Sequence, residues 1–285
     1  MIFRTKMQGA RLAWLLVPAA LAGWTPAPAA TADVELWRLD CGSIKVKDLS
    51  AFSDTFDYAG QSRELTDSCY LIRHGEDYML WDTGLPAALL NAPQGDQAMA
   101  PTLKRTIPDQ LKEIGVAVER IGTVGVSHDH FDHLGQAASF PKATLLIGAA
   151  DLAALKSEPP PFGVDPSLVA PWLKEGGKVE GVEGDKDLFG DGSVTMLSAP
   201  GHTPGSHALL VRLAQKGPVL LSGDVVHFEE QFENRGVPPF NWDRAASLAS
   251  MDRLGHMAKS LDATLVVQHD AQDVAKLPAF PASAK

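Results

Sequence analysis

The stretch Ser127-His128-Asp129-His130-Phe131-Asp132-His133-Leu134-Gly135 decides how this chain is interpreted. His128, His130, Asp132 and His133 place four side chains that can bind a metal within six residues. Such a cluster would be costly in an ordinary core, because buried polar groups need partners. Three imidazoles and a carboxylate at this spacing therefore predict a metal centre.

Further out along the chain, four apolar runs each end in a metal-competent residue. Residues 121–126 precede the quoted cluster, and residues 194–197 precede His202, which lies between Pro-Gly pairs at 200–201 and 204–205. Asp224 and His269 follow two more such runs. Ligands commonly gather at the carboxyl ends of strands. The four strand ends thus predict one site built from nitrogen and oxygen ligands.

Composition limits the alternatives. The chain has 285 residues, a formal net charge of -10 and only two cysteines. This length suits one large soluble domain, and the acidic balance without a Lys/Arg cluster argues against a nucleic-acid partner. Two cysteines cannot build a zinc site made of thiolates, so histidines and carboxylates must hold any metal.

Residues 1–29 are predicted to be a secretory signal. Arg4, Lys6 and Arg11 precede the apolar run 12–22, and a small-residue stretch, 27–32, follows. The apolar run is shorter than the roughly 20 residues that span a bilayer. We expect cleavage after Ala29 or Ala32, a single hydrolase domain over residues 30–285, and a periplasmic or secreted protein that has no membrane attachment after cleavage.

Cys41 and Cys69 leave two alternatives open. Export would place them in an oxidising compartment, where a disulfide can form. The sequence does not give their separation in space, so buried free thiols are equally compatible.

The rest of the chain alternates short β-rich runs with a few helical patterns. The predicted strands are Val34–Leu39, Cys69–Arg73, Tyr78–Trp81, Ile121–Ser127, Thr144–Ile147, Val194–Leu197, Ala208–Leu213, Val219–Leu221 and Thr264–Gln268. The predicted helices are Thr102–Ile114, Ala149–Lys156, Pro166–Glu175 and Asp243–Ser260, the last with Asp243 as its N-cap. The Pro-rich residues 158–171 are expected to form a surface loop or lid. This pattern indicates a sheet-rich α/β domain with helices outside.

These motifs, from Trp81-Asp82-Thr83-Gly84 through His269, resemble those of the metallo-β-lactamase superfamily. The resemblance implies an αββα sandwich, in which two mixed sheets are flanked by helices, with two divalent metal ions at one sheet edge. Zinc is the expected metal, since imidazole and carboxylate ligands suit it, and iron, manganese and cobalt are compatible with the same ligands. Asp82 would either support the histidine loop or serve as a plain turn residue.

The resemblance also implies a ligand set. One metal would be bound by His128, His130 and His202. The second would be bound by Asp132, His133 and His269, and Asp224 would bridge both.

Within the superfamily, the N-acyl-homoserine lactonases are the most similar group. The matching pieces are Ser68–Ile72, Trp81–Pro86, His130–His133, Pro200–Gly205 and Gly217–Leu221. The resemblance implies opening of a lactone ring by a hydroxide that bridges the two metals, as in quorum quenching. Asp132 would pass a proton to the leaving oxygen. These lactonases usually carry a tyrosine where this chain has His227, which we expect to act as a catalytic donor in its place.

Five aromatic residues are candidates for an apolar channel that takes an acyl chain, although packing is the simpler role for most of them. They are Phe131, Phe228, Phe232, Phe240 and Trp242. The expected partner is a small-molecule lactone, and a homodimer is compatible with the sequence. Among the other histidines, His207 is expected to be structural, and nothing singles out His74 or His256.

Other activities remain open on the same site. An exported β-lactamase of the B3 type also uses histidines in the first motif, although it usually lacks an aspartate at the bridging position. Phosphotriester, ester or thioester hydrolysis is also compatible with such a site. A non-catalytic binding module would be expected to lack some ligands, and here the set is complete.

Overall fold

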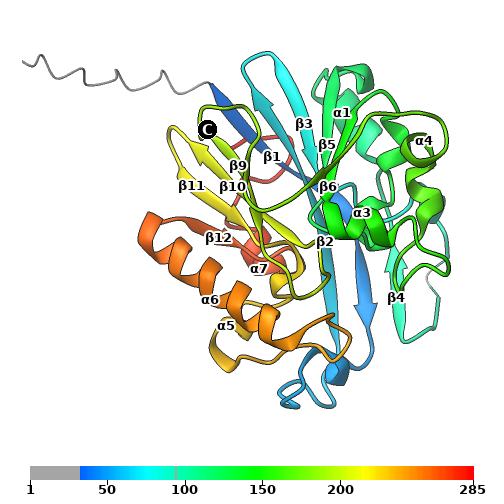
Figure 1. Cartoon of the computed structure of the whole chain (residues 1–285), viewed down its shortest axis with the longest axis vertical. Coiled ribbons are helices and arrows are strands. Elements are labelled where there is room, and N and C mark those ends of the chain that lie inside the picture. Colours follow the sequence, from blue (N-terminus) through cyan, green and yellow to red (C-terminus); the bar gives the residue numbers. More distant parts are fainter. Residues whose placement is uncertain (1–32, 94) are drawn as a thin grey trace, which may run out of the picture. The chain divides into compact units, whose positions relative to one another are not determined.

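Two β-sheets pack face to face in the computed structural model, which describes residues 33–93 and 95–285 (Figure 1). The predicted signal segment, residues 1–29, lies outside the described residues. No helix among the described residues has the length and hydropathy needed to cross a membrane.

The first sheet has seven strands and is mixed. Its order is β4 (Met99–Thr102), β1 (Val34–Val46), β2 (Arg63–His74), β3 (Asp77–Trp81), β5 (Ile121–Gly125), β6 (Thr144–Gly148) and β7 (Val179–Val182). The pairs from β4 to β3 are antiparallel, whereas β3, β5, β6 and β7 run parallel. Because β3 and β5 are parallel neighbours, the loops after them, at residues 82 and 126, leave the same edge.

The second sheet has five strands. Its order is β12 (Thr264–Val266), β11 (Gly217–Leu221), β10 (His207–Leu213), β9 (Val194–Ser198) and β8 (Lys186–Asp187). Only the β11–β12 pair is parallel. The segments that follow β11 and β12 therefore also leave one edge together, and they carry Asp224 and His269.

Apolar side chains fill three layers of core. Between the sheets, Tyr70 and Trp81 of the first pack with Met196 and Leu209 of the second. A fully buried Met or Leu side chain, such as Met196 or Leu209, contributes about 1.5–3 kcal/mol.

Helices cover both outer faces (Figure 1). Leu111 of α1 (Ile107–Glu113) and Trp172 of α4 (Ala170–Leu173) pack over the first sheet, on the side where α3 (Ala149–Ala154) also lies. Met251 and Leu254 of α6 (Arg244–Leu261) pack over the second sheet. The predicted αββα sandwich is confirmed.

All nine predicted strands occur, and Asp243 caps α6 by accepting a hydrogen bond from Ala246 N at 2.6 Å. The prediction of a helix from Thr102 was wrong at its start, because Met99–Thr102 pairs with β1 and Thr106 caps the helix instead. The predicted helix Pro166–Glu175 is a 3-10 turn followed by the short α4. Short elements were missed: β4, β7, β8, α5 (Gln231–Asn234) and α7 (Ala271–Val274).

A disulfide joins Cys41 of β1 to Cys69 of β2, which decides the alternative that the sequence left open. The bond packs directly against Gly84, where an added Cβ would lie 2.3 Å from Cys41 Cβ. Gly84 O in turn accepts a hydrogen bond from Gly135 N at 2.7 Å. The disulfide is thus part of the packing beneath the turn that supports the histidine segment.

Candidate metal centre

All seven predicted metal-site side chains converge between the two sheets' edges. His128 and His130 follow β5, and Asp132 and His133 lie on α2 (Phe131–Leu134). The other three come from the second sheet: His202 from the β9–β10 loop, Asp224 from a 3-10 turn after β11, and His269 after β12. Residues more than 140 positions apart thereby meet in one site.

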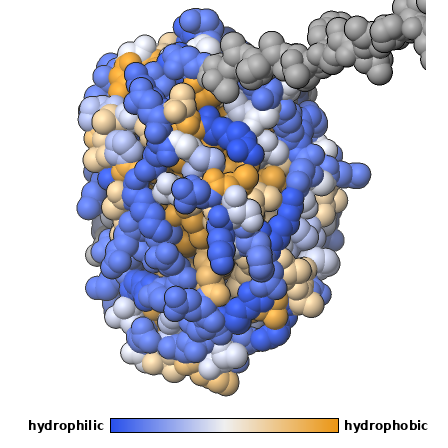
Figure 2. Space-filling model, turned by 90° about the vertical axis from the view of Figure 1, so that its left-hand side faces the viewer, coloured by the Kyte–Doolittle hydropathy of each residue, from blue (hydrophilic) through white to orange (hydrophobic). Residues whose placement is uncertain are grey.

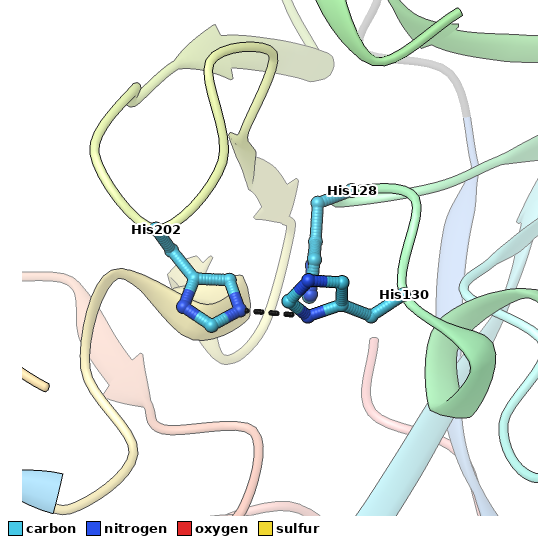
Figure 3. A group of neighbouring side chains, drawn as sticks. All are labelled: His128, His130 and His202. Atoms are coloured by element: carbon cyan, nitrogen blue, oxygen red, sulfur yellow. Dashed lines mark hydrogen bonds between the residues drawn. The ribbon is translucent and has the colours of Figure 1, made fainter. Parts of the chain in front are cut away.

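His128, His130 and His202 form a first cluster (Figure 3). His130 Nδ1 and His202 Nε2 face each other at 3.0 Å from two different loops, and His128 lies beside them. The ring centroid of His128 lies 4.6 Å from the ring centroids of both His130 and His202. Three imidazole nitrogens therefore point at one small volume.

Asp132, His133 and His269 form a second cluster. Asp132 Oδ2 lies 4.0 Å from the Nε2 atoms of both histidines. His133 and His269 are almost fully buried, whereas Asp132 is partly exposed. The carboxylate is thus the member of this cluster that a substrate can reach.

Asp224 lies between the two clusters. Its Oδ2 is 3.5 Å from His202 Nε2 and 3.8 Å from His128 Nε2. Its Oδ1 is 3.4 Å from His133 Nε2 and 3.1 Å from His269 Nε2. One carboxylate therefore turns one oxygen toward each cluster.

Most of these imidazoles are oriented through the nitrogen that faces away from Asp224. His202 Nδ1 lies 3.0 Å from Asn241 Oδ1, His269 Nδ1 lies 2.8 Å from Thr66 O, and His128 Nδ1 lies 3.1 Å from Ser127 Oγ. Ligating histidines typically have such partners, which set the tautomer and leave the other nitrogen free for a cation.

Asp82 supports the histidine loop, the first of its two predicted roles. It is buried and accepts hydrogen bonds from Ser127 N at 2.6 Å and Gln268 Nε2 at 3.1 Å. Its Oδ2 also lies 3.1 Å from His133 Nδ1. Asp82 therefore ties the first strand-end loop to α2 and to the segment before His269.

Burial and the Asp224 carboxylate act in opposite directions on the histidines of the site. Burial lowers the pKa of His128, His130 and His202. Burial acts in the same direction on His269, but the Asp224 carboxylate outweighs it and raises that pKa to about 9. Burial raises the pKa of Asp224, yet the nearby imidazoles outweigh it and hold that pKa well below its ordinary value. Asp224 therefore stays ionised.

The unpartnered atoms fit a metal. His128 Nε2, His133 Nε2 and Asp224 Oδ1 are buried and make no hydrogen bond. Buried polar atoms without partners are rare and often mark an ion or water site. Imidazole nitrogens and carboxylate oxygens are ligands that zinc accepts. The donor set and its orphaned atoms thus match a site for divalent cations.

His227 points into the same site but differs from the other histidines. Its Nε2 lies 3.3 Å from Asp224 Oδ2, and its ring stacks with that of His269 at 5.7 Å. Its Nδ1 is buried and has no hydrogen-bond partner, so no acceptor sets its tautomer. The structure therefore places His227 at the site, in a further group of possible ligands with His202 and Asp224, but without the anchoring that most of the other histidines have.

Four of the five aromatic candidates divide into two groups, and the fifth, Phe232, packs against the core over the second sheet. Phe228 is fully buried against Phe52 and Tyr58, and Phe131 packs against the same cluster. Phe240 and Trp242 are 40% and 59% exposed. They lie on the loop before α6, where Trp242 N donates to His202 O at 3.0 Å.

A hollow of about 900 Å³ opens beside the site, between α5, α6 and α7. His269 and Phe232 line it, together with many charged residues that include Arg63, Glu233 and Lys259. Figure 2 faces the side of the molecule that carries α6 and shows hydrophilic residues over most of it, with apolar residues between them. This largely charged lining does not suit an acyl chain.

The remaining histidines lie away from the two clusters. His207 is buried, with Nδ1 2.7 Å from Gly205 O, which matches the structural role expected of it. His74 lies near Asp191, and His256 Nδ1 lies 2.7 Å from Asp252 O.

Sequence reasoning missed several residues of the site. Asn241 and Ser127 orient His202 and His128, and nothing in the sequence marks them. Gln268 could have been suspected from its place beside His269. Asp67 was also missed: burial and the Asp132 carboxylate hold its pKa well above its ordinary value.

Comparison with known proteins decides the family. A family model described as the metallo-beta-lactamase superfamily matches residues 63–269. The chain belongs to the metallo-β-lactamase superfamily.

The superfamily members that are similar to this chain include several proteins named as lactonases. N-acyl homoserine lactonase AttM of Rhizobium radiobacter is 28% identical over 249 residues, which cover 84% of this chain and 94% of that protein. An N-acyl homoserine lactonase from a Bacillus species is 29% identical over 230 residues, covering 78% of this chain and 88% of that protein.

Solved structures agree on the fold. A quorum-quenching N-acyl homoserine lactone hydrolase has a TM-score of 0.75 and 25% identity, covering 89% of this chain and 98% of its own. Another such hydrolase, with N-hexanoyl-L-homoserine bound at its catalytic metal centre, has a TM-score of 0.74 and 24% identity over 89% of this chain and 99% of its own. As a metallo-β-lactamase superfamily member with these His/Asp clusters, the protein is a metal-dependent hydrolase.

Proposed function

We propose that this hydrolase opens the lactone ring of N-acyl homoserine lactones. The observation that carries the proposal is Asp224, whose two oxygens face two separate clusters of ligands. Relatives named as N-acyl homoserine lactonases, similar over most of the chain, support this substrate class.

Two divalent cations, most simply Zn²⁺, would occupy the clusters. His128, His130 and His202 would hold one, and Asp132, His133 and His269 would hold the other. Asp224 would bridge them. Such cations lower the pKa of water and polarise a carbonyl, which is the chemistry that ester hydrolysis requires.

Two side chains of the chain itself would handle protons. His227 Nε2 lies at the site's wall, where a protonated nitrogen can donate a hydrogen bond to the substrate carbonyl oxygen. Asp132 is partly exposed, so its carboxylate can carry a proton to the oxygen that leaves when the ring opens.

The acyl chain would lie over Phe240 and Trp242. Both are exposed, and the Phe240 ring lies 5.9 Å from that of His227 and 6.0 Å from that of His202. An apolar surface beside the reacting centre suits a fatty acyl group better than the charged hollow near α6 does.

We also propose that the protein is exported and acts outside the cytoplasm. The basic and apolar pattern of residues 1–29 supports this, and so does the Cys41–Cys69 disulfide, since disulfides persist mainly in oxidising compartments. N-terminal sequencing of the protein from periplasmic and culture fractions would test it. A product beginning at residue 30 or 33 is expected, and full-length protein in the cytoplasm would contradict export.

A pH-stat assay of the zinc-loaded protein tests the activity. We expect proton release from N-acyl homoserine lactones, with faster turnover for longer chains, and a loss of activity on chelation that added Zn²⁺ restores. A carbapenem and paraoxon serve as competing substrates. Turnover of either of these without turnover of any lactone would reject the proposed substrate class.

A further inference from the structure

Asp67 is a buried acid without a partner. It lies in β2, is 0% exposed, and neither of its carboxylate oxygens makes a hydrogen bond. Burying such a group uncompensated costs several kcal/mol. A fold that retains it calls for a physical explanation.

Two other buried carboxylates near the site, Asp82 and Asp151, have hydrogen-bond donors that Asp67 lacks. Asp82 accepts hydrogen bonds from Ser127 N and Gln268 Nε2. Asp151 accepts from Gly205 N at 2.7 Å. Among the described residues, Asp224 and Asp273 each have one unpartnered buried carboxylate oxygen, whereas both oxygens of Asp67 lack a partner.

The local backbone places Asp67 beside the second cluster. The pairing register of β1 and β2 shifts between Asp40 and Ser43, opposite Asp67, and such bulges often re-aim side chains near active sites. The preceding residue, Thr66, is bonded to His269 through both its N–H and its C=O, at 3.1 and 2.8 Å.

The charges around Asp67 agree with this placement. Burial is the largest cause that raises the pKa of the Asp67 carboxyl, and the ionisable groups that act on it are Asp132, His133, His269 and Asp82. The first three are the members of the second cluster. Asp67 does not belong to any group of ligand atoms within 4.8 Å of one another, so a cation held by that cluster would not contact it directly.

We propose that Asp67 is a positioning residue of the second cation site, reaching the cation at Asp132, His133 and His269 through an intervening water molecule. This rests on the proposed metal site and extends it. The carboxylate adds a negative charge that favours a divalent cation at this position, and the cation and water supply the partners that its oxygens lack. The first cluster lies on the other side of Asp224 and should not depend on it.

Stepwise titration of the metal-free protein with Co²⁺, followed by its visible absorption, measures the two sites without any substrate. In Asp67→Asn, which keeps the shape but loses the charge, the dissociation constant of Co²⁺ at the second cluster should rise about 10- to 100-fold. The dissociation constant of Co²⁺ at the first cluster should change by less than about threefold. The metal-free variant should unfold at the same temperature as the wild type or higher, since a buried unpaired acid has been removed.

Glu35→Gln is the matched control, because Glu35 is also a buried acid of the first sheet but is paired with Arg73. It should leave both Co²⁺ constants unchanged. Asp67→Ser provides a second, smaller variant with the same expected result, should Asp67→Asn not fold.

An unchanged Co²⁺ dissociation constant at the second cluster, or an equal rise of the dissociation constants at both clusters, would overturn the role of Asp67. If the wild type binds two Co²⁺ ions but hydrolyses no lactone, the proposed substrate fails while this inference stands. If Asp67→Asn binds both Co²⁺ ions as the wild type does and the wild type opens lactones, the inference about Asp67 fails while the proposed substrate stands.

Discussion

The Asp82 carboxylate lies 3.1 Å from His133 Nδ1, although the two residues are 51 positions apart. Both side chains are fully buried. The contact orients the ring so that Nε2 faces Asp132 and Asp224. A single strand-end turn of the first sheet thus sets the direction of a metal-competent nitrogen.

Replacing Asp82 should weaken cation binding without unfolding the protein. Asp82→Asn keeps the volume but alters the acceptor for His133, and loss of such a partner typically costs 10- to 100-fold in metal affinity. Competition of the zinc-loaded protein with a chelator measures this. Asp77→Asn, at an exposed position in the strand that precedes Asp82, is the control and should bind zinc as the wild type does. Equal affinities for the two variants would contradict the role of Asp82.

Asp224 and His269 should differ in how many cations their loss removes. Asp224→Ala removes a carboxylate that faces both clusters, so elemental analysis should find well under one zinc per chain. His269→Ala touches one cluster and should leave about one. Retention of two cations by Asp224→Ala would show that it does not bridge them. Lactone turnover should fall at least about 100-fold in both variants.

His227 should affect turnover more than metal content. His227→Phe keeps the ring's bulk but removes its nitrogens, and loss of a positioned donor typically costs about 100-fold or more in kcat. His227→Tyr restores a hydroxyl donor and should recover much of the activity. The zinc content of both variants should equal that of the wild type. A loss of zinc in His227→Phe would instead identify His227 as a ligand.

Gly163 should be required because it lies against His130, a proposed metal ligand. An added Cβ would lie 2.8 Å from His130 Cδ2, at a backbone φ of +83°. Gly163→Ala should therefore displace His130 and weaken zinc binding in chelator competition. Gly176→Ala is the matched control, since its φ is +80° but nothing lies within 4 Å of the added Cβ. It shares the backbone strain and should keep its zinc. Similar zinc affinities in the two variants would mean that Gly163 does not position His130.

The disulfide should contribute substantially to stability. Cys41 and Cys69 close a loop with a sequence separation of 28 residues. Loop-closure entropy predicts a loss of about 3–4 kcal/mol in the free energy of unfolding for Cys41→Ser/Cys69→Ser. Urea denaturation of the metal-free protein measures it, and dithiothreitol should destabilise the wild type but not the double variant. A loss below about 1 kcal/mol would contradict this estimate.

Much of the architecture could be predicted from local sequence patterns. Alternating and continuous apolar runs located nine strands, and Asp243 marked the start of α6, because periodicity and capping are local properties. The short elements β7, β8 and α7 were missed, since so few residues carry no periodic signal and owe their conformation to their neighbours. The helix predicted from Thr102 began too early, because Thr102 pairs with β1 as the last residue of β4 and pairing outweighed local preference.

By itself, the sequence determined the chemistry: which residues can bind a metal, and that strand ends present them. The types of these residues and their spacing along the chain are properties of the sequence alone. Only the tertiary structure decided that one oxygen of Asp224 faces each cluster, that Cys41 bonds to Cys69, that Asp82 orients His133, and that Asp67 is buried without a hydrogen-bond partner. These are relationships between segments far apart in the chain, and they depend on how two sheets and their loops pack in space.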